Sequence, residues 1–279
     1  MTLDFDNIED WAPKLTAALR PHVSNYIEQK LLEAAPEYEY IEDTQDMLFH
    51  LTDRDAVIDA VVAWLRSSKI AGYHGSRLTD SEVHSIQVNG LIPLEPETRR
   101  DRLTRALSPN SRWPKVAPQL DAAIQAYGQG SRAGRREGQV HLTLSRAGLT
   151  QGFNHYLTYG SEFDQHVAQK LLGTEGMELL ASYGEPRVFK VAVPGALALD
   201  AANRYFTVDD FRDRGEIPNL VSEFLKSWVH RLVCPSFQSN TLKVDCGIVF
   251  HQTIPAAWIT GFDTLSEAYN RNSLSTNEA

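Results

Sequence analysis

Three successive residues, His74-Gly75-Ser76, have the types and order in this sequence that best suit ligand chemistry. The imidazole and the hydroxyl offer directed hydrogen bonds, and the glycine lets a ligand approach the bare backbone. Tyr73 and Arg77 flank the tripeptide. Because a short motif constrains function loosely, the tripeptide alone more often marks a turn with an exposed histidine. Its meaning therefore depends on the elements that position it.

The elements around the tripeptide form a recognisable order. The short apolar run 70–74 ends at Gly75, which predicts a strand that enters a tight turn. Thr79 followed by Glu82 forms a capping box, which predicts that a helix begins there. The helix is expected to end at Asn89-Gly90, a pair that allows a left-handed residue, before a strand over 91–94. The unit is therefore strand, turn, short helix, glycine stop and strand.

A second strand is predicted over 139–145, where apolar and polar residues alternate. It carries His141. With the His-Gly-Ser unit and the Asn89-Gly90 stop, this strand resembles the ADP-ribosyltransferase superfamily in its order of elements, over roughly residues 70–262. The helix, glycine and histidine-containing strand are also similar to the tRNA 2′-phosphotransferase branch of that superfamily.

The resemblance implies roles for these residues in binding NAD as a substrate. His74 would bond a ribose hydroxyl, the backbone of Gly75 would hold the nicotinamide amide, and Ser76 would assist there. His141 would occupy the position at which many family members stack a tyrosine on the nicotinamide ring. Tyr73 and Arg77 belong to the same binding stretch.

The implied chemistry is departure of nicotinamide through an oxocarbenium-like state, which needs a nearby anion. Family members carry a glutamate on a late strand, but the predicted strand 245–250 has Cys246 in that place. Asp245 is adjacent, although a shift of one residue along a strand turns a side chain to the opposite face. Glu162, after Gly160, is the other candidate acid. It is equally well explained as a first-turn acid that the helix dipole favours.

Charge is unevenly distributed along the chain. The formal net charge of −9 argues against a protein that coats nucleic acid. Residues 99–136, however, hold eight arginines and one lysine against two aspartates, which suits contact with an anionic or macromolecular target. A solvated basic insertion explains the same pattern.

The 279 residues suffice for one sizeable core with an appendage. We expect an α+β protein: an N-terminal helical lobe packed on a split, antiparallel-rich β-sheet core that resembles the ADP-ribosyltransferase fold. After residue 70 we expect strands to dominate, with short helices between them. The predicted organisation is a lobe over 1–68, a core over 69–264 with an arginine-rich insertion over 98–137, and a C-terminal tail over 265–279.

The N-terminus is acidic and is not typical of a signal peptide, and no apolar run reaches the length of a membrane span. We therefore expect a cytoplasmic protein without a membrane partner. The two cysteines exclude a disulfide framework. His230, Cys234, Cys246 and His251 have the ligand types of a zinc site but lack its tight cysteine spacing, so we predict buried cysteines and no metal.

The function expected from this resemblance is transfer of ADP-ribose from NAD to a macromolecule, protein or nucleic acid, by a toxin-like or defence effector. Two alternatives stay open. A non-catalytic NAD- or nucleotide-binding module would keep the pocket without the acid. An RNA 2′-phosphotransferase-like enzyme would use arginines such as Arg77 and Arg146.

Overall fold

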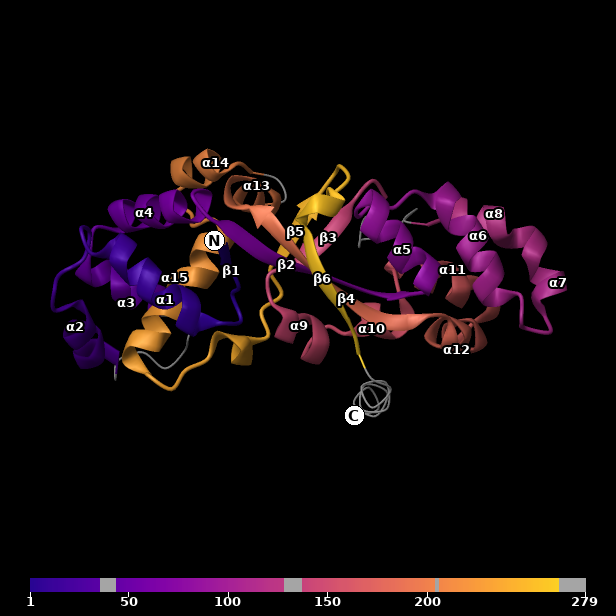
Figure 1. Cartoon of the computed structure of the whole chain (residues 1–279), viewed down its shortest axis with the longest axis horizontal. Coiled ribbons are helices and arrows are strands. Elements are labelled where there is room, and N and C mark those ends of the chain that lie inside the picture. Colours follow the sequence, from indigo (N-terminus) through magenta and orange to yellow (C-terminus); the bar gives the residue numbers. More distant parts are fainter. Residues whose placement is uncertain (36–43, 128–136, 204–205, 266–279) are drawn as a thin grey trace. The chain divides into compact units, whose positions relative to one another are not determined.

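A six-stranded sheet is the central element of the computed structural model, which describes residues 1–35, 44–127, 137–203 and 206–265 (Figure 1). The strand order is β5-β3-β2-β4-β6, and β1 pairs in parallel with β2. The chain is thus mixed α and β, as expected. The strands are β1 (Thr2–Leu3), β2 (Lys69–Leu78), β3 (Val140–Thr143), β4 (Glu185–Pro194), β5 (Gly247–Phe250) and β6 (Ile259–Thr264).

The chain divides into two compact units, and the unit boundaries fall inside β2, β3, β4, β5 and one helix. Each unit therefore contains parts of several strands. Unit 1 comprises residues 1–72, 143–149 and 191–248, and unit 2 comprises residues 73–142, 150–190 and 249–279.

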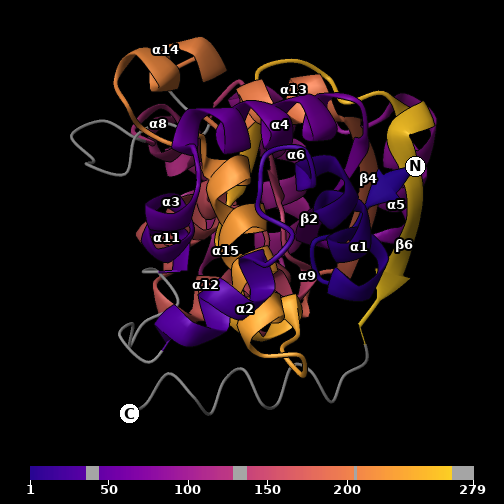
Figure 2. The same ribbon diagram turned by 90° about the vertical axis from the view of Figure 1, so that its left-hand side faces the viewer.

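Unit 1 contains the helices of the predicted N-terminal lobe and packs α15 against them (Figure 2). Its core is aromatic: the Trp11 and Phe224 rings lie 4.9 Å apart, edge to face, and Phe5 contacts both. Burying each such ring stabilises the fold by roughly 1.5–3 kcal/mol. The helices are α1 (Ile8–Leu19), α2 (Ile27–Ala34), α3 (Thr44–Leu51), α4 (Arg54–Arg66), α13 (Gly195–Ala201), α14 (Val208–Asp213) and α15 (Asn219–Val233).

Unit 2 holds a second core, in which Leu103 and Leu107 meet Phe163 and Val167. These residues come from α6 and α11, which Figure 1 shows beside α8. The helices of unit 2 are α5 (Asp80–Asn89), α6 (Pro96–Leu107), α7 (Trp113–Val116), α8 (Leu120–Gln125), α10 (His155–Tyr159), α11 (Glu162–Leu172) and α12 (Thr174–Ser182), while α9 (Arg146–Gln151) crosses the boundary between the units.

Several local predictions are confirmed. The Thr79 side chain accepts from the backbone of Glu82, whose own side chain accepts from the Thr79 backbone, so the capping box forms. Helix α5 ends at Gly90, which adopts φ +82°. Asp53 caps α4 by accepting from the backbone of Ala56.

Other predictions are wrong. The tight turn expected at His74–Ser76 is absent, because β2 continues as a strand to Leu78. The strand expected over 91–94 is reduced to one antiparallel bridge between Leu91 and Ile254. Strands do not dominate after residue 70, since α5 to α8 fill the segment between β2 and β3.

None of the helices in the described ranges is long and apolar enough to cross a membrane. The predicted C-terminal tail, apart from Leu265, lies outside the described residues.

Candidate functional site

Strand β2 carries the residues that the sequence singled out. His74 and Gly75 are half-buried, while Ser76 and Arg77 are 8% and 7% exposed. Tyr73 is buried, and the Lys190 ammonium lies 5.8 Å from its ring centroid. The strand therefore presents His74 and Gly75 as its most accessible members in this stretch.

The imidazole of His74 is fixed by the neighbouring strand. Its Nδ1 atom lies 2.9 Å from the carbonyl oxygen of His141. A carbonyl oxygen only accepts, so Nδ1 carries the hydrogen and Nε2 keeps its lone pair. Burial lowers the pKa of His74, and the nearby charge of Arg99 lowers it further, against the opposing effect of the His141 carbonyl. His74 is therefore a neutral acceptor at neutral pH.

His141 contributes its backbone to this arrangement, and its ring has a separate contact. The Nε2 atom of His141 lies 2.8 Å from the amide oxygen of Gln139, so Nε2 is the donor. The structure thus brings His74 and His141 together through a carbonyl group. Ring stacking of His141 on a nicotinamide stays a prediction.

Glu162, the first residue of α11, is held by two side chains of α10. The hydroxyl of Tyr156 donates to Glu162 Oε1 over 2.7 Å, and His155 Nε2 lies 3.7 Å from the same oxygen. The Glu162 side chain keeps 29% of its surface exposed. It is therefore an oriented and partly exposed carboxylate.

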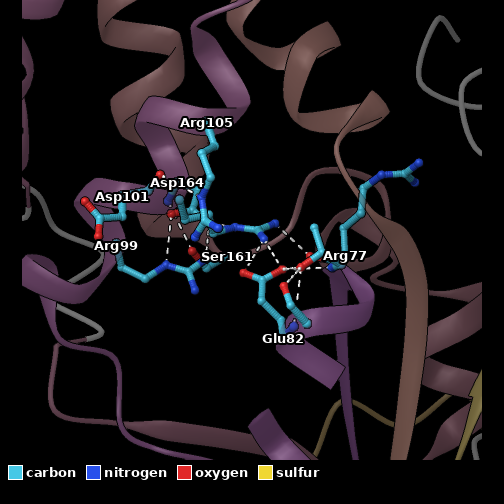
Figure 3. Close-up of polar contacts among 10 residues, drawn as sticks. Arg77, Glu82, Arg99, Asp101, Arg105, Ser161 and Asp164 are labelled. Carbon is cyan, nitrogen blue, oxygen red and sulfur yellow. Dashed lines mark hydrogen bonds and ion pairs between the residues drawn. The ribbon is translucent and has the colours of Figure 1, made fainter. Parts of the chain in front are cut away.

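A buried ion-pair network lies next to Glu162 and was not predicted from the sequence (Figure 3). The fully buried Asp164 accepts from Arg99 and from the Nε of Arg102, which lies 3.1 Å away. Arg102 also donates to Glu82 over 2.5 Å and to the carbonyl oxygen of Arg77 over 2.7 Å. Four elements, β2, α5, α6 and α11, are thereby joined through one guanidinium group.

Charge stabilises both acids of this network. Burial by itself would raise the pKa of Asp164, but the charges of Arg99 and Arg102 outweigh burial and bring that pKa below its usual range. Burial is likewise outweighed at Glu82, whose pKa is lowered by Arg102 and by the Thr79 backbone. Both carboxylates are therefore ionised and already paired.

The network places the start of α11 beside β2. A Cβ atom at Gly160 would lie 3.6 Å from Arg102 Nη2 and 3.9 Å from the Arg77 carbonyl oxygen. Ser161 then caps α11 by accepting from the backbone of Asp164. Glu162 follows directly, so the start of α11 lies close to β2 at Arg77.

Asp245 and Arg146 belong to unit 1, whereas the residues above belong to unit 2. Asp245 is exposed and precedes β5, so the strand predicted from residue 245 begins two residues later, at Gly247. Cys246 is buried, and burial raises the pKa of its thiol to about 12. The thiol is therefore neutral at neutral pH.

The zinc ligand set has no support in the described chain. Among the described residues, no group of three or more histidines, cysteines, aspartates or glutamates is arranged to hold a metal ion. Both cysteines are free thiols.

Most described arginines of the segment 99–136 have internal partners. Besides Arg99 and Arg102, Arg100 pairs with Asp121 and Arg112 pairs with Glu175. Arg105 is exposed and donates to a backbone carbonyl of its own helix. The remaining three arginines, Arg132, Arg135 and Arg136, lie outside the described residues. Docking of a target by this segment stays a prediction.

In comparisons with known proteins, no family model, curated protein or solved structure matches this chain.

Proposed function

We propose that unit 2 binds NAD and transfers its ADP-ribose to a macromolecular acceptor. The observations that support the proposal are a neutral, oriented His74 on β2 and an oriented, partly exposed Glu162 at the start of α11, where the preceding Gly160 lies close to the Arg77 carbonyl oxygen of the same strand. His74 Nε2 suits a hydrogen bond from a ribose hydroxyl. The half-buried carboxylate suits a developing positive charge.

In the proposed reaction, the bond between ribose C1′ and the nicotinamide nitrogen breaks, and its electron pair passes to the nicotinamide ring. An acceptor nucleophile then bonds to C1′ and loses its proton. Glu162 is the acid that the contacts favour for stabilising the cationic ribose. Asp164 is fully buried between two arginines, and Glu82, although 23% of its side chain is exposed, forms an ion pair with the buried Arg102.

A binding module without catalysis is the second candidate, and Cys246 favours it. In the superfamily that the sequence resembles, a glutamate occupies the position that the resemblance gives to Cys246. The neutral thiol of Cys246 supplies no anion. NAD would then bind without losing nicotinamide. A protein that binds NAD in calorimetry but releases none of its nicotinamide supports this candidate over transfer.

The test of transfer is nicotinamide release from NAD by the full chain. We expect Glu162→Gln to reduce release by about 100- to 1,000-fold, the size typical of losing one transition-state electrostatic partner. Glu178→Gln is the matched control, because Glu178 is an exposed acid on α12. If Asp245→Asn abolishes nicotinamide release while Glu162→Gln leaves it unchanged, the acid is Asp245 instead.

A 2′-phosphorylated RNA oligonucleotide supplied with NAD separates the RNA 2′-phosphotransferase alternative. Loss of the 2′-phosphate from the RNA would favour that alternative over transfer to an ordinary acceptor.

A further inference from the structure

A hydrogen bond joins Tyr156 of α10 to Glu162 of α11. The Tyr156 hydroxyl donates to Glu162 Oε1 over 2.7 Å, the usual length of a hydrogen bond between oxygen atoms. Such a bond to a carboxylate is roughly twice as strong as one between neutral groups. His155 Nε2 lies 3.7 Å from the same oxygen, which is too far for a hydrogen bond. Of these two contacts, the one from Tyr156 therefore has the greater effect on the direction of the carboxylate.

The turn between α10 and α11 is fixed by other contacts. Ser161 accepts from the Asp164 backbone over 3.1 Å, and the Gln165 side chain donates over 2.8 Å to the carbonyl oxygen that precedes Ser161. Asp164 is itself paired with two arginines. None of these contacts involves the Tyr156 hydroxyl. Removing that hydroxyl should therefore change the orientation of the Glu162 side chain and leave the turn in place.

The Tyr156 ring is restrained on its own helix. Tyr156 is half-buried, and the His155 ring lies against it with the ring centroids 4.0 Å apart. A tyrosine side chain has only two rotatable torsions, so holding it costs little conformational entropy. The donor to Glu162 is thus ordered by the protein itself.

A carboxylate with one bonded oxygen cannot rotate freely about its last bond, so its second oxygen has a set direction. The bond also favours the ionised form of Glu162, because the hydroxyl donates to the charged group. An anion that is directed in advance at a developing positive charge stabilises the transition state without reorganisation during the reaction.

We propose that Tyr156 is a positioning residue for Glu162 in the transfer of ADP-ribose, a role that rests on the function proposed above. Tyr156 acts through the carboxylate, which it directs and keeps ionised, and it does not itself contact NAD or exchange a proton. Its hydroxyl should therefore contribute to turnover and not to NAD binding. This contribution should disappear when Glu162 has lost its charge.

The test is the kinetics of nicotinamide release from NAD by the full chain. We expect Tyr156→Phe to lower kcat about 10- to 100-fold, the change that corresponds to one hydrogen bond to a charged group. The KM for NAD should stay unchanged, because the lost interaction acts on the transition state. Tyr159→Phe is the matched control and should keep the wild-type kcat. Tyr159 is a half-buried tyrosine of the same helix, and the described chain shows no hydrogen bond from it to Glu162.

A double variant separates positioning from a direct role. If Tyr156 acts only through the carboxylate, Tyr156→Phe should lower kcat much less in a Glu162→Gln background than in the wild type. An equal loss of kcat in both backgrounds would show that Tyr156 acts independently of Glu162 and would overturn the proposal. Thermal unfolding of each variant checks the fold, and a raised KM together with a lowered unfolding temperature would assign Tyr156 a structural role instead.

The same measurements distinguish failure of this proposal from failure of the proposed function. If the wild type releases nicotinamide and Tyr156→Phe releases it with the same kcat, only the role of Tyr156 is wrong. If the wild type releases none, the proposed transfer is wrong and the role of Tyr156 falls with it.

Discussion

The Nδ1 nitrogen of His74 donates a hydrogen bond of 2.9 Å to the carbonyl oxygen of His141, so the adjacent strands β2 and β3 select one tautomer of the imidazole. The selected form leaves Nε2 as an acceptor. Because the hydrogen-bond partner is a backbone atom, no substitution of the His141 side chain removes it directly. The acceptor at Nε2, which the proposed function needs, therefore depends on a backbone contact within the sheet.

Replacing His74 should weaken NAD binding without unfolding the protein. We expect His74→Ala to raise the Kd for NAD about tenfold, because one neutral hydrogen bond contributes about 0.5–1.5 kcal/mol. Isothermal titration calorimetry measures the Kd, and circular dichroism checks the fold. His84→Ala is the matched control, since His84 is an exposed histidine on α5. An unchanged Kd in a folded His74→Ala protein would contradict the site.

The lowered pKa of His74 predicts a pH dependence of stability. The unfolded chain takes up a proton at this residue near pH 6.5, whereas burial and Arg99 delay uptake in the folded chain. The stability that neutral His74 contributes is thus fully present above about pH 6.5 and is lost as pH falls toward the folded pKa. The free energy of urea unfolding should fall in this range for the wild type relative to His74→Gln. A constant difference between pH 5 and 8 would show that His74 is not responsible.

Removing the Asp164 carboxylate should strongly destabilise unit 2. Asp164→Asn leaves Arg99 and Arg102 without their shared buried anion, and breaking a buried pair costs about 3–5 kcal/mol. Urea unfolding at pH 7 measures the loss. Asp121→Asn is the control, because its ion pair with Arg100 is more than half exposed and such pairs contribute about 0–1 kcal/mol. Similar losses in the two variants would rule out a special role for the buried network.

Two local signals in the sequence correctly predicted where helix α5 begins and ends. The Thr79 and Glu82 capping box and the Gly90 stop depend on residues within a few positions of one another, and both formed as expected. The Asp164 network escaped prediction because its partners are distant in sequence: Arg99 and Arg102 lie more than sixty positions before Asp164. In the sequence, these arginines were therefore interpreted as part of a solvated basic insertion. The fold instead pairs them with the distant Asp164.

The sequence also failed to predict that β2 continues as a strand through Gly75, for a different reason. Glycine allows a turn but does not require one, and the pairing of β2 with β3 and β4 keeps the strand extended. Likewise, nothing local distinguishes Arg77, which forms no ion pair within the described ranges, from Arg187, which pairs with Asp80 and Glu185. Their difference arises only from the tertiary arrangement.

Gly90→Ala should destabilise the fold for two separable reasons. Gly90 adopts φ +82° and ψ −171°, a region that essentially only glycine occupies and that costs another residue about 1–3 kcal/mol. An added Cβ would also lie 2.0 Å from the carbonyl oxygen of Ile254, which belongs to the antiparallel bridge with Leu91. Since backbone atoms cannot yield as a flexible side chain can, that bridge must open. The control is Gly138→Ala, where φ is +70° and nothing lies within 4 Å of the new atom. Urea unfolding should show a clearly larger loss for Gly90→Ala than for Gly138→Ala, and equal losses would mean that backbone strain alone accounts for Gly90.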